Sequence, residues 1–134
     1  MNKNFKITQS ISIEGEGFYY DLHNNYDFST FELSTLNNFA LIKFIKTKGE
    51  WVPLESPPNV ILSFYGLKYV SFSKYFFINQ SKNIEELGYK ETKGENLDWL
   101  IQEDKALPED HLVIRFDNDE FVRIYAETIE ITLD

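Results

Sequence analysis

This sequence has no cysteine, one methionine, two histidines and four prolines among its 134 residues. Without cysteine there are no disulfide bonds, thiolate metal ligands or cysteine nucleophiles, so packing alone must stabilise the fold. No apolar run approaches the ~20 residues of a membrane span, and no apolar run of signal-peptide length follows the N-terminal lysines. We therefore expect a cytoplasmic protein that does not enter a membrane.

Motifs of common enzymes and cofactor sites are also missing. The sequence contains no Gly-x-Ser-x-Gly motif, phosphate-binding glycine loop or dinucleotide fingerprint. His23 and His111 are far apart and neither has zinc-type spacing. The run 117–120 resembles part of a calcium loop but lacks the sharp-turn glycine and the distal glutamate. We expect no cofactor and no metal, and we favour a non-enzymatic role.

Apolar material is plentiful, with 43% hydrophobic and 16% aromatic residues. A chain of this length buries most of its apolar surface around one core, which predicts a single domain over residues 1–134. Short β-branched and aromatic runs with a period of two predict a mainly β fold, with α+β as the alternative. We expect an antiparallel sheet in a barrel or sandwich with one or two short helices.

Several segments read as strands. Residues 5–14 alternate apolar and polar side chains, interrupted by Gln9, and residues 28–33 and 39–47 form two more runs joined by the turn-forming pair Asn37-Asn38. Residues 60–65 and 67–73 pivot about Gly66, as a tight hairpin or as one bent strand. The aromatic residues crowded between positions 64 and 77 are either a binding surface or a doubly covered core.

Two segments read as helical. Residues 84–87 form a short helical turn with Gly88 just past its end. Residues 96–103 are the better helix candidate, because Leu97, Leu100 and Ile101 lie on one stripe.

A hairpin is predicted near the end of the sequence, from residues 111–116 and 121–125. A two-residue loop at Asn118-Asp119 would place Arg123 among the apolar side chains. A three-residue loop over 118–120 instead groups residues 112, 114 and 116 with residues 122, 124 and 126, which keeps charge out of the core. We adopt the three-residue loop, and we expect a bulge or bend near Glu127-Thr128.

Charge is distributed unevenly along the chain, whose formal net charge is −9. Residues 1–94 hold ten acids and ten lysines, whereas residues 95–134 hold twelve acids and three bases, so the whole excess lies in the last segment. This balance disfavours nucleic acid and favours a basic protein partner, although a solubilising face is the other interpretation. The candidate partner-binding acids are Glu95, Asp98, Glu103, Asp104, Glu109, Asp110, Asp117, Asp119 and Glu120.

Two further groups could carry chemistry. In the adopted register Arg115 and Arg123 face each other across the hairpin, so something anionic should lie beside them. That partner is a bound anion or, as we favour, neighbouring carboxylates such as Glu127 or Glu130. Glu14 and Glu16 are spaced like an acid and base pair, but the glycines beside them indicate a strand end.

The pattern of strand-forming residues over 112–127, preceded by that over 60–67, resembles the pattern in small uncharacterised bacterial proteins, some of which are immunity proteins of toxin systems. The resemblance implies a small acidic protein that blocks a toxin's active or binding surface. We therefore expect a protein-binding domain for a basic partner, such as a toxin domain. The alternatives are a small-molecule-binding barrel or minor hydrolase, and a structural module of a larger assembly.

Overall fold

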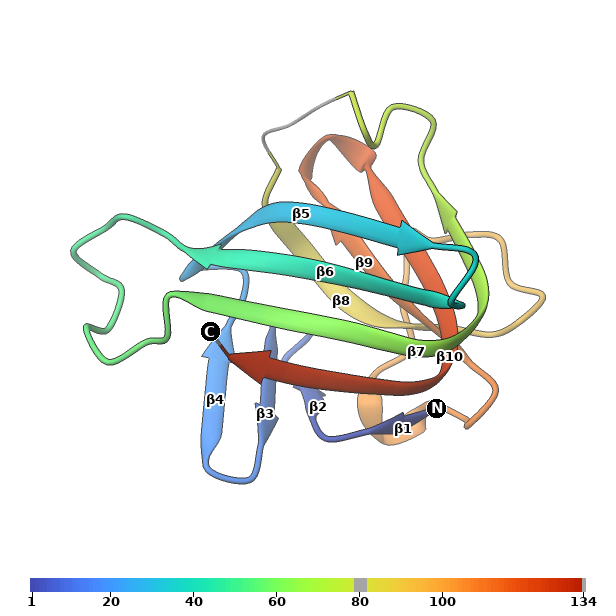
Figure 1. The fold of residues 1–134 in the computed structure, drawn as a ribbon, viewed down its shortest axis with the longest axis horizontal. Helices are drawn as coiled ribbons and strands as arrows, with labels where there is room; N and C mark the ends of the chain where they lie inside the picture. The colour runs from blue at the N-terminus through green and yellow to red at the C-terminus, as the bar shows by residue number, and fades with distance from the viewer. Residues whose placement is uncertain (79–81, 134) are drawn as a thin grey trace.

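Seven strands form one curled sheet, and three more form a small second sheet (Figure 1). The structure is a computed structural model that describes residues 1–78 and 82–133. Along the large sheet the order is β5-β6-β7-β10-β9-β8, all antiparallel, and β1 pairs with β10 in parallel. The strands are β1 (Asn2–Lys3), β2 (Lys6–Thr8), β3 (Ser12–Gly15), β4 (Phe18–Asp21), β5 (Tyr26–Ser34), β6 (Phe39–Lys46), β7 (Asn59–Phe72), β8 (Ile84–Lys90), β9 (His111–Phe116) and β10 (Phe121–Leu133).

The mainly β class predicted from the sequence is confirmed. The large sheet curls into a half-barrel, so that β8 and β9 lie behind β5 and β6 in Figure 1. Two three-residue 3-10 turns, η1 (Glu103–Lys105) and η2 (Asp117–Asp119), are the only helical segments among the described residues. None of the described helices is long and apolar enough to cross a membrane.

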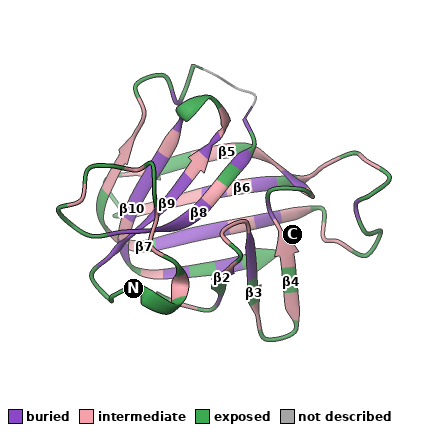
Figure 2. Ribbon diagram, turned by 180° about the vertical axis from the view of Figure 1, so that it is seen from behind, coloured by how far each residue is buried: buried purple, intermediate pink, exposed green. Residues whose placement is uncertain are grey.

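The core fills the inside of the curl, and buried positions recur along β6, β7, β9 and β10 (Figure 2). Phe28 on β5 and Phe116 on β9 come from distant places in the strand order, yet their rings lie 5.3 Å apart. Phe76, from the segment after β7, packs against both rings. These aromatic contacts, and not backbone pairing, close the open side of the half-barrel.

A sharp bend divides the large sheet into two halves. Residues 60–65 and 67–73 belong to one strand, β7, so the bent strand and not the hairpin is correct at Gly66. Gly66 has a φ of +65°, a conformation that glycine adopts without strain. The pairing of β10 with β7 shifts between Tyr125 and Ala126, where β7 has the extra residue Lys68, and the bend expected on β10 near Glu127-Thr128 lies just beyond this shift. The parity of β10 that faces the core changes between Ala126 and Ile129, both of which are buried, and Thr128 pairs with Tyr65 beside the bend at Gly66.

The first predicted strand is a hairpin. Residues 5–14 are divided between β2 and β3, which pair with each other through a turn at Gln9 and Ser10. Both turn residues have positive φ, the conformation that tight hairpin turns require. Gln9 therefore interrupts the apolar alternation because the chain reverses there.

Both helix predictions are wrong. Residues 84–87 begin strand β8, where a bulge between Ile84 and Glu86 turns both Ile84 and Leu87 toward the core. That bulge gives a strand the i, i+3 spacing of a helix. Residues 96–103 form irregular backbone, and Ile101 pairs with Tyr89 at the edge of β8. A helix of eight residues is only marginally stable in isolation. Pairing with the edge of β8 therefore satisfies the backbone of Ile101 better than a short helix would.

The β9–β10 hairpin has the predicted faces but a different register. The loop comprises residues 117–119, and Val122 pairs with Ile114 and Ile124 with Leu112. Residues 112, 114 and 116 share the inner face with residues 122, 124 and 126, as predicted. The expectation that Arg115 and Arg123 oppose each other is wrong, because Arg123 pairs with Val113 and Arg115 with Phe121.

Candidate protein-interaction surface

Residues 91–110, which we call the acidic loop, lie over the outer face of β8, β9 and β10 (Figure 1). Gly88 on β8 marks one contact, because a Cβ there would come within 2.7 Å of the Leu100 Cβ. Val113, which points to this outer face, is fully buried. The loop therefore covers this half of the sheet as closely as a regular element would.

Arg123 holds the loop from beneath. Its guanidinium donates to the carbonyl oxygens of Gly94 (2.6 Å), Glu91 (2.8 Å) and Thr92 (3.2 Å), and the side chain is buried. Its Nε donates to Nδ1 of His111 at 2.9 Å. Hydrogen bonds from a charged donor are stronger than neutral ones, so four of them from one side chain fix this stretch of backbone.

Lys90 supports the middle of the loop. The ammonium group donates to the carbonyl oxygen of Trp99 at 3.0 Å and lies 3.2 Å from the centroid of the Trp99 ring. Burial lowers the pKa of Lys90, partly offset by Glu91, while the charge of Arg123 lowers it further. The two cations under the loop are thus bonded to its backbone and not to its carboxylates.

Glu103 ties the end of the loop to the N-terminal strands. Its carboxylate accepts hydrogen bonds from the Tyr89 hydroxyl (2.6 Å), the Ile7 backbone N–H (2.8 Å) and Lys3 (2.9 Å). Burial by itself would raise the pKa of Glu103, but these three donors outweigh it and lower the pKa. Burial and the neighbouring Glu103 raise the pKa of Tyr89. Glu103 is therefore a structural anion inside the fold.

Five carboxylates of the acidic loop face solvent, Glu91 and four of the predicted acids. Glu95, Asp98, Asp104 and Glu109 are all exposed, and none of them forms an ion pair with a described residue. Arg123 and Lys90 hold the backbone on either side of Glu95 and Asp98, and the hydrogen bonds of Glu103 and Asp110 hold the backbone next to Asp104 and Glu109. These charges are therefore carried on a fixed support. Together with Asp119 at the β9–β10 turn, they are the exposed part of the predicted acidic surface.

Two of the predicted partner-binding acids, Asp110 and Glu120, are buried, and a third, Glu103, is partly buried. Glu103 is bonded as described above, and Asp110 is buried and accepts a hydrogen bond from the Leu107 N–H at 2.8 Å. Glu120 is buried and lies 3.4 Å from the ammonium group of Lys82. Their charges stabilise the protein internally, and two are matched by lysines from the first part of the chain.

The remaining predicted residues lie on the β9–β10 hairpin. Asp119 is exposed at the turn, and Asp117 is partly exposed and accepts from the Asn83 N–H at 3.1 Å. Arg115 is paired with Glu86 at 3.1 Å, so a carboxylate is its neighbour, although not Glu127 or Glu130. Arg123 is satisfied by carbonyl oxygens and His111. The structure therefore does not bring the two arginines together as one anion site.

No family model, curated protein or solved structure matches this chain. The surface must therefore be interpreted from its own geometry. Over residues 1–78 and 82–133, no group of three or more His, Asp or Glu side chains is placed to hold a metal ion.

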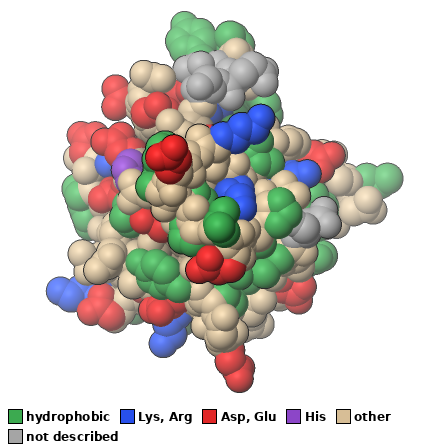
Figure 3. Space-filling view, turned by 90° about the vertical axis from the view of Figure 1, so that its left-hand side faces the viewer, with side chains coloured by type: hydrophobic (Ala, Val, Ile, Leu, Met, Phe, Trp, Pro, Cys, Tyr) green, Lys and Arg blue, Asp and Glu red, His purple; other side chains and the backbone are tan. Residues whose placement is uncertain are grey.

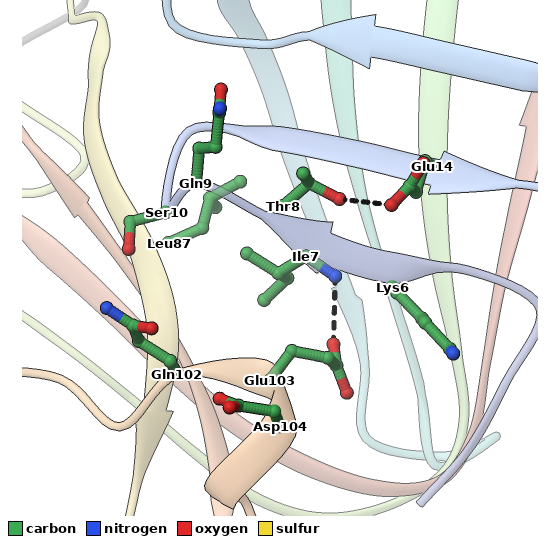
Figure 4. Close-up of a pocket in the computed structure, with 10 residues that line it drawn as sticks. All are labelled: Lys6, Ile7, Thr8, Gln9, Ser10, Glu14, Leu87, Gln102, Glu103 and Asp104. Atoms are coloured by element: carbon green, nitrogen blue, oxygen red, sulfur yellow. Dashed lines mark hydrogen bonds between the residues drawn. The ribbon is translucent and has the colours of Figure 1, made fainter.

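A shallow opening of about 400 Å³ lies between the β2–β3 hairpin and η1 (Figure 4). Glu14 lines it but is hydrogen-bonded to Thr8 at 2.8 Å, while Lys6 and Asp104 bring charges of opposite sign. Glu16 lies outside this opening and lines a neighbouring one with Glu14. The side of the molecule shown in Figure 3 likewise has acidic, basic and hydrophobic side chains interspersed. The first opening is thus lined by the carboxylates Glu14, Glu103 and Asp104 and by Lys6, and Glu14 and Glu103 are already hydrogen-bonded within the protein.

Sequence reasoning did not find the residues that hold the surface. Lys90 and Arg123 are single charges at outward positions of strands, which is where a solvated charge is expected. The only available signal was the failure of residues 91–110 to continue any strand pattern. Such a signal identifies a loop but not the side chains beneath it.

Proposed function

We propose that this chain is a non-enzymatic protein-binding domain that recognises a basic protein partner through the acidic loop. The observation that carries the proposal is the support of residues 91–99 by Arg123 and Lys90, and of residues 103–110 by the hydrogen bonds of Glu103 and Asp110, while Glu95, Asp98, Asp104 and Glu109 are exposed. Loops held on a rigid sheet are common recognition elements.

Preorganisation favours this role over that of a solubilising face. A flexible acidic segment would lose conformational entropy on binding, whereas a backbone already fixed by Arg123 loses little. Unpaired surface carboxylates also attract a cationic partner over several ångströms and accelerate its association. Solubility alone requires the charges but not their fixed placement.

The partner class that fits is a toxin with a basic active or binding surface, which would make this an immunity-type protein. A toxin acting on nucleic acid needs such a surface to hold phosphates. An acidic loop could occupy that surface by mimicking its charge.

The test uses a four-fold charge reversal of Glu95, Asp98, Asp104 and Glu109 to lysine. A matched control reverses Glu16, Glu50, Glu55 and Glu85, which are also exposed and change the net charge equally. Wild type and both variants serve as bait in a lysate of the native host, and each captured protein is purified for kinetic measurements at low and high salt.

We expect a basic partner whose association rate falls about tenfold or more for the loop variant and is retained for the control, with affinity weakening as salt increases. Equal losses in both variants would mean that only net charge matters. Unchanged binding of every captured protein by the loop variant would refute the role of the loop.

A further inference from the structure

The outer face of the large sheet is covered in one half and uncovered in the other. Beyond the bend at Gly66, the acidic loop covers the outer face of β8, β9 and the first part of β10. Before the bend, no described segment crosses the outer face of β5, β6, β7 and β10, which faces the viewer in Figure 1. One half thus has an internal cover and the other has none.

We define the open face by the sheet register. Tyr65 lies opposite Phe39, Ser63 opposite Leu41, and Ile61 opposite Lys43, and these pairs continue onto β5 and β10. The open face consists of Asp27, Thr30, Glu32 and Ser34 on β5, Phe39, Leu41, Lys43 and Ile45 on β6, Asn59, Ile61, Ser63 and Tyr65 on β7, and Thr128, Glu130 and Thr132 on β10.

Apolar side chains on the open face are concentrated on its central strands β6 and β7, where Lys43 and Ser63 lie among them. Three of the four outward residues of β6 are hydrophobic, whereas a solvated sheet face normally alternates polar residues outward. Ile45 is 41% exposed and Tyr65 is 44% exposed, and the Phe39 and Tyr65 rings contact each other at 5.2 Å. Adjacent aromatic and aliphatic side chains on central strands are typical anchors of protein interfaces.

The charges around this apolar centre indicate which partner fits. Asp27 and Glu32 border it on β5 and Glu130 borders it on β10, while Lys43 is the single base of the face. A second copy of the chain would bring the same acidic border and a net charge of −9. Repulsion between two such surfaces disfavours self-association.

We propose that the open face is a second docking surface, for a folded protein that presents an apolar centre bordered by lysine or arginine. This site goes beyond the recognition role of the acidic loop, because it lies on the other half of the sheet and uses none of the loop residues. The partner replaces, for this half, the cover that residues 91–110 supply for the other.

The test replaces Leu41 and Ile61 with lysine in the full chain, which removes apolar surface and repels a cationic border. The matched control is Leu36→Lys with Tyr19→Lys, which gives the same charge change at apolar residues that are 91% and 51% exposed elsewhere. Each protein captured from the native host is purified, and its dissociation constant is measured for wild type, both variants and the acidic-loop reversal. Sedimentation of the wild type alone reports its oligomeric state.

Support requires a purified partner whose dissociation constant rises at least about tenfold for the Leu41 and Ile61 variant while the control binds as wild type does. The acidic-loop reversal separates the two proposals. It should weaken the binding of a partner that docks on the loop, whereas a partner of the open face should bind this variant as tightly as it binds wild type. Wild-type dimers abolished by the Leu41 and Ile61 variant would overturn the proposal in favour of a second copy. Equal binding by the variant and the control for every partner would overturn it altogether, provided that circular dichroism shows both variants folded.

Discussion

Replacing Arg123 with methionine should detach the acidic loop from the sheet. The substitution removes four hydrogen bonds, to Gly94, Glu91, Thr92 and His111. Each such bond to a charged donor contributes ~1.5–3 kcal/mol, but water can replace the donor at the exposed Glu91 and Thr92 carbonyls, and burying the guanidinium is itself costly. We expect a net loss of about 3 kcal/mol in the free energy of unfolding, which for this chain length lowers Tm by about 10 °C.

Urea unfolding measures the total loss, and hydrogen exchange shows where it occurs. The amides of Gly94 and Ile101, which are hydrogen-bonded within or beneath the loop, should exchange faster in the variant. Arg115→Met is the control, because its guanidinium makes one side-chain hydrogen bond, to Glu86, and should contribute about 1 kcal/mol or less. The reasoning is refuted if Arg123→Met unfolds within about 1 kcal/mol of wild type and the loop amides keep their protection.

Two further perturbations test buried charges. Burial and, second, the nearby charge of Arg123 lower the pKa of His111, although Asp110 opposes the shift. The unfolded chain therefore binds the proton more readily than the folded protein does. As a result, the free energy of unfolding must fall as pH drops from about 7 through the folded pKa. His111→Gln should flatten this fall in urea unfolding between about pH 7.5 and about pH 5, and a slope equal to wild type would contradict the assignment. Lys82→Met should cost about 3–5 kcal/mol by leaving Glu120 buried without its cation, and adding Glu120→Met should restore most of it in thermal unfolding. A single-variant loss below about 1 kcal/mol would show that the pair is not coupled.

Strands with strict alternation could be predicted from the sequence. On β6, Ala40, Ile42 and Phe44 point inward, and the preceding turn at Asn38 adopts a φ of +48°. Each of these features depends on a few neighbouring residues. Local patterns therefore sufficed for the fold class and for several strand positions.

Features that depend on pairing between distant segments could not be predicted. A bulge at β8 made Ile84 and Leu87 look helical, because periodicity does not record an extra residue in one strand. The stripe of Leu97, Leu100 and Ile101 reads as helix until Tyr89 supplies a strand partner. Likewise, the sequence gives no indication that Arg123 meets the carbonyls of residues about thirty positions earlier.

Strand β10 lies between β7 and β9 and also pairs with β1, although it is the last strand along the chain. During synthesis β5, β6 and β7 emerge before β8, β9 and β10, and Leu62 and Phe64 belong to a core that includes residues of β8, β9 and β10. A ribosome-bound intermediate that lacks β10 would therefore expose apolar side chains and unpaired strand edges. Chaperone binding to nascent chains should therefore fall once β10 has emerged and paired with β7 and β9.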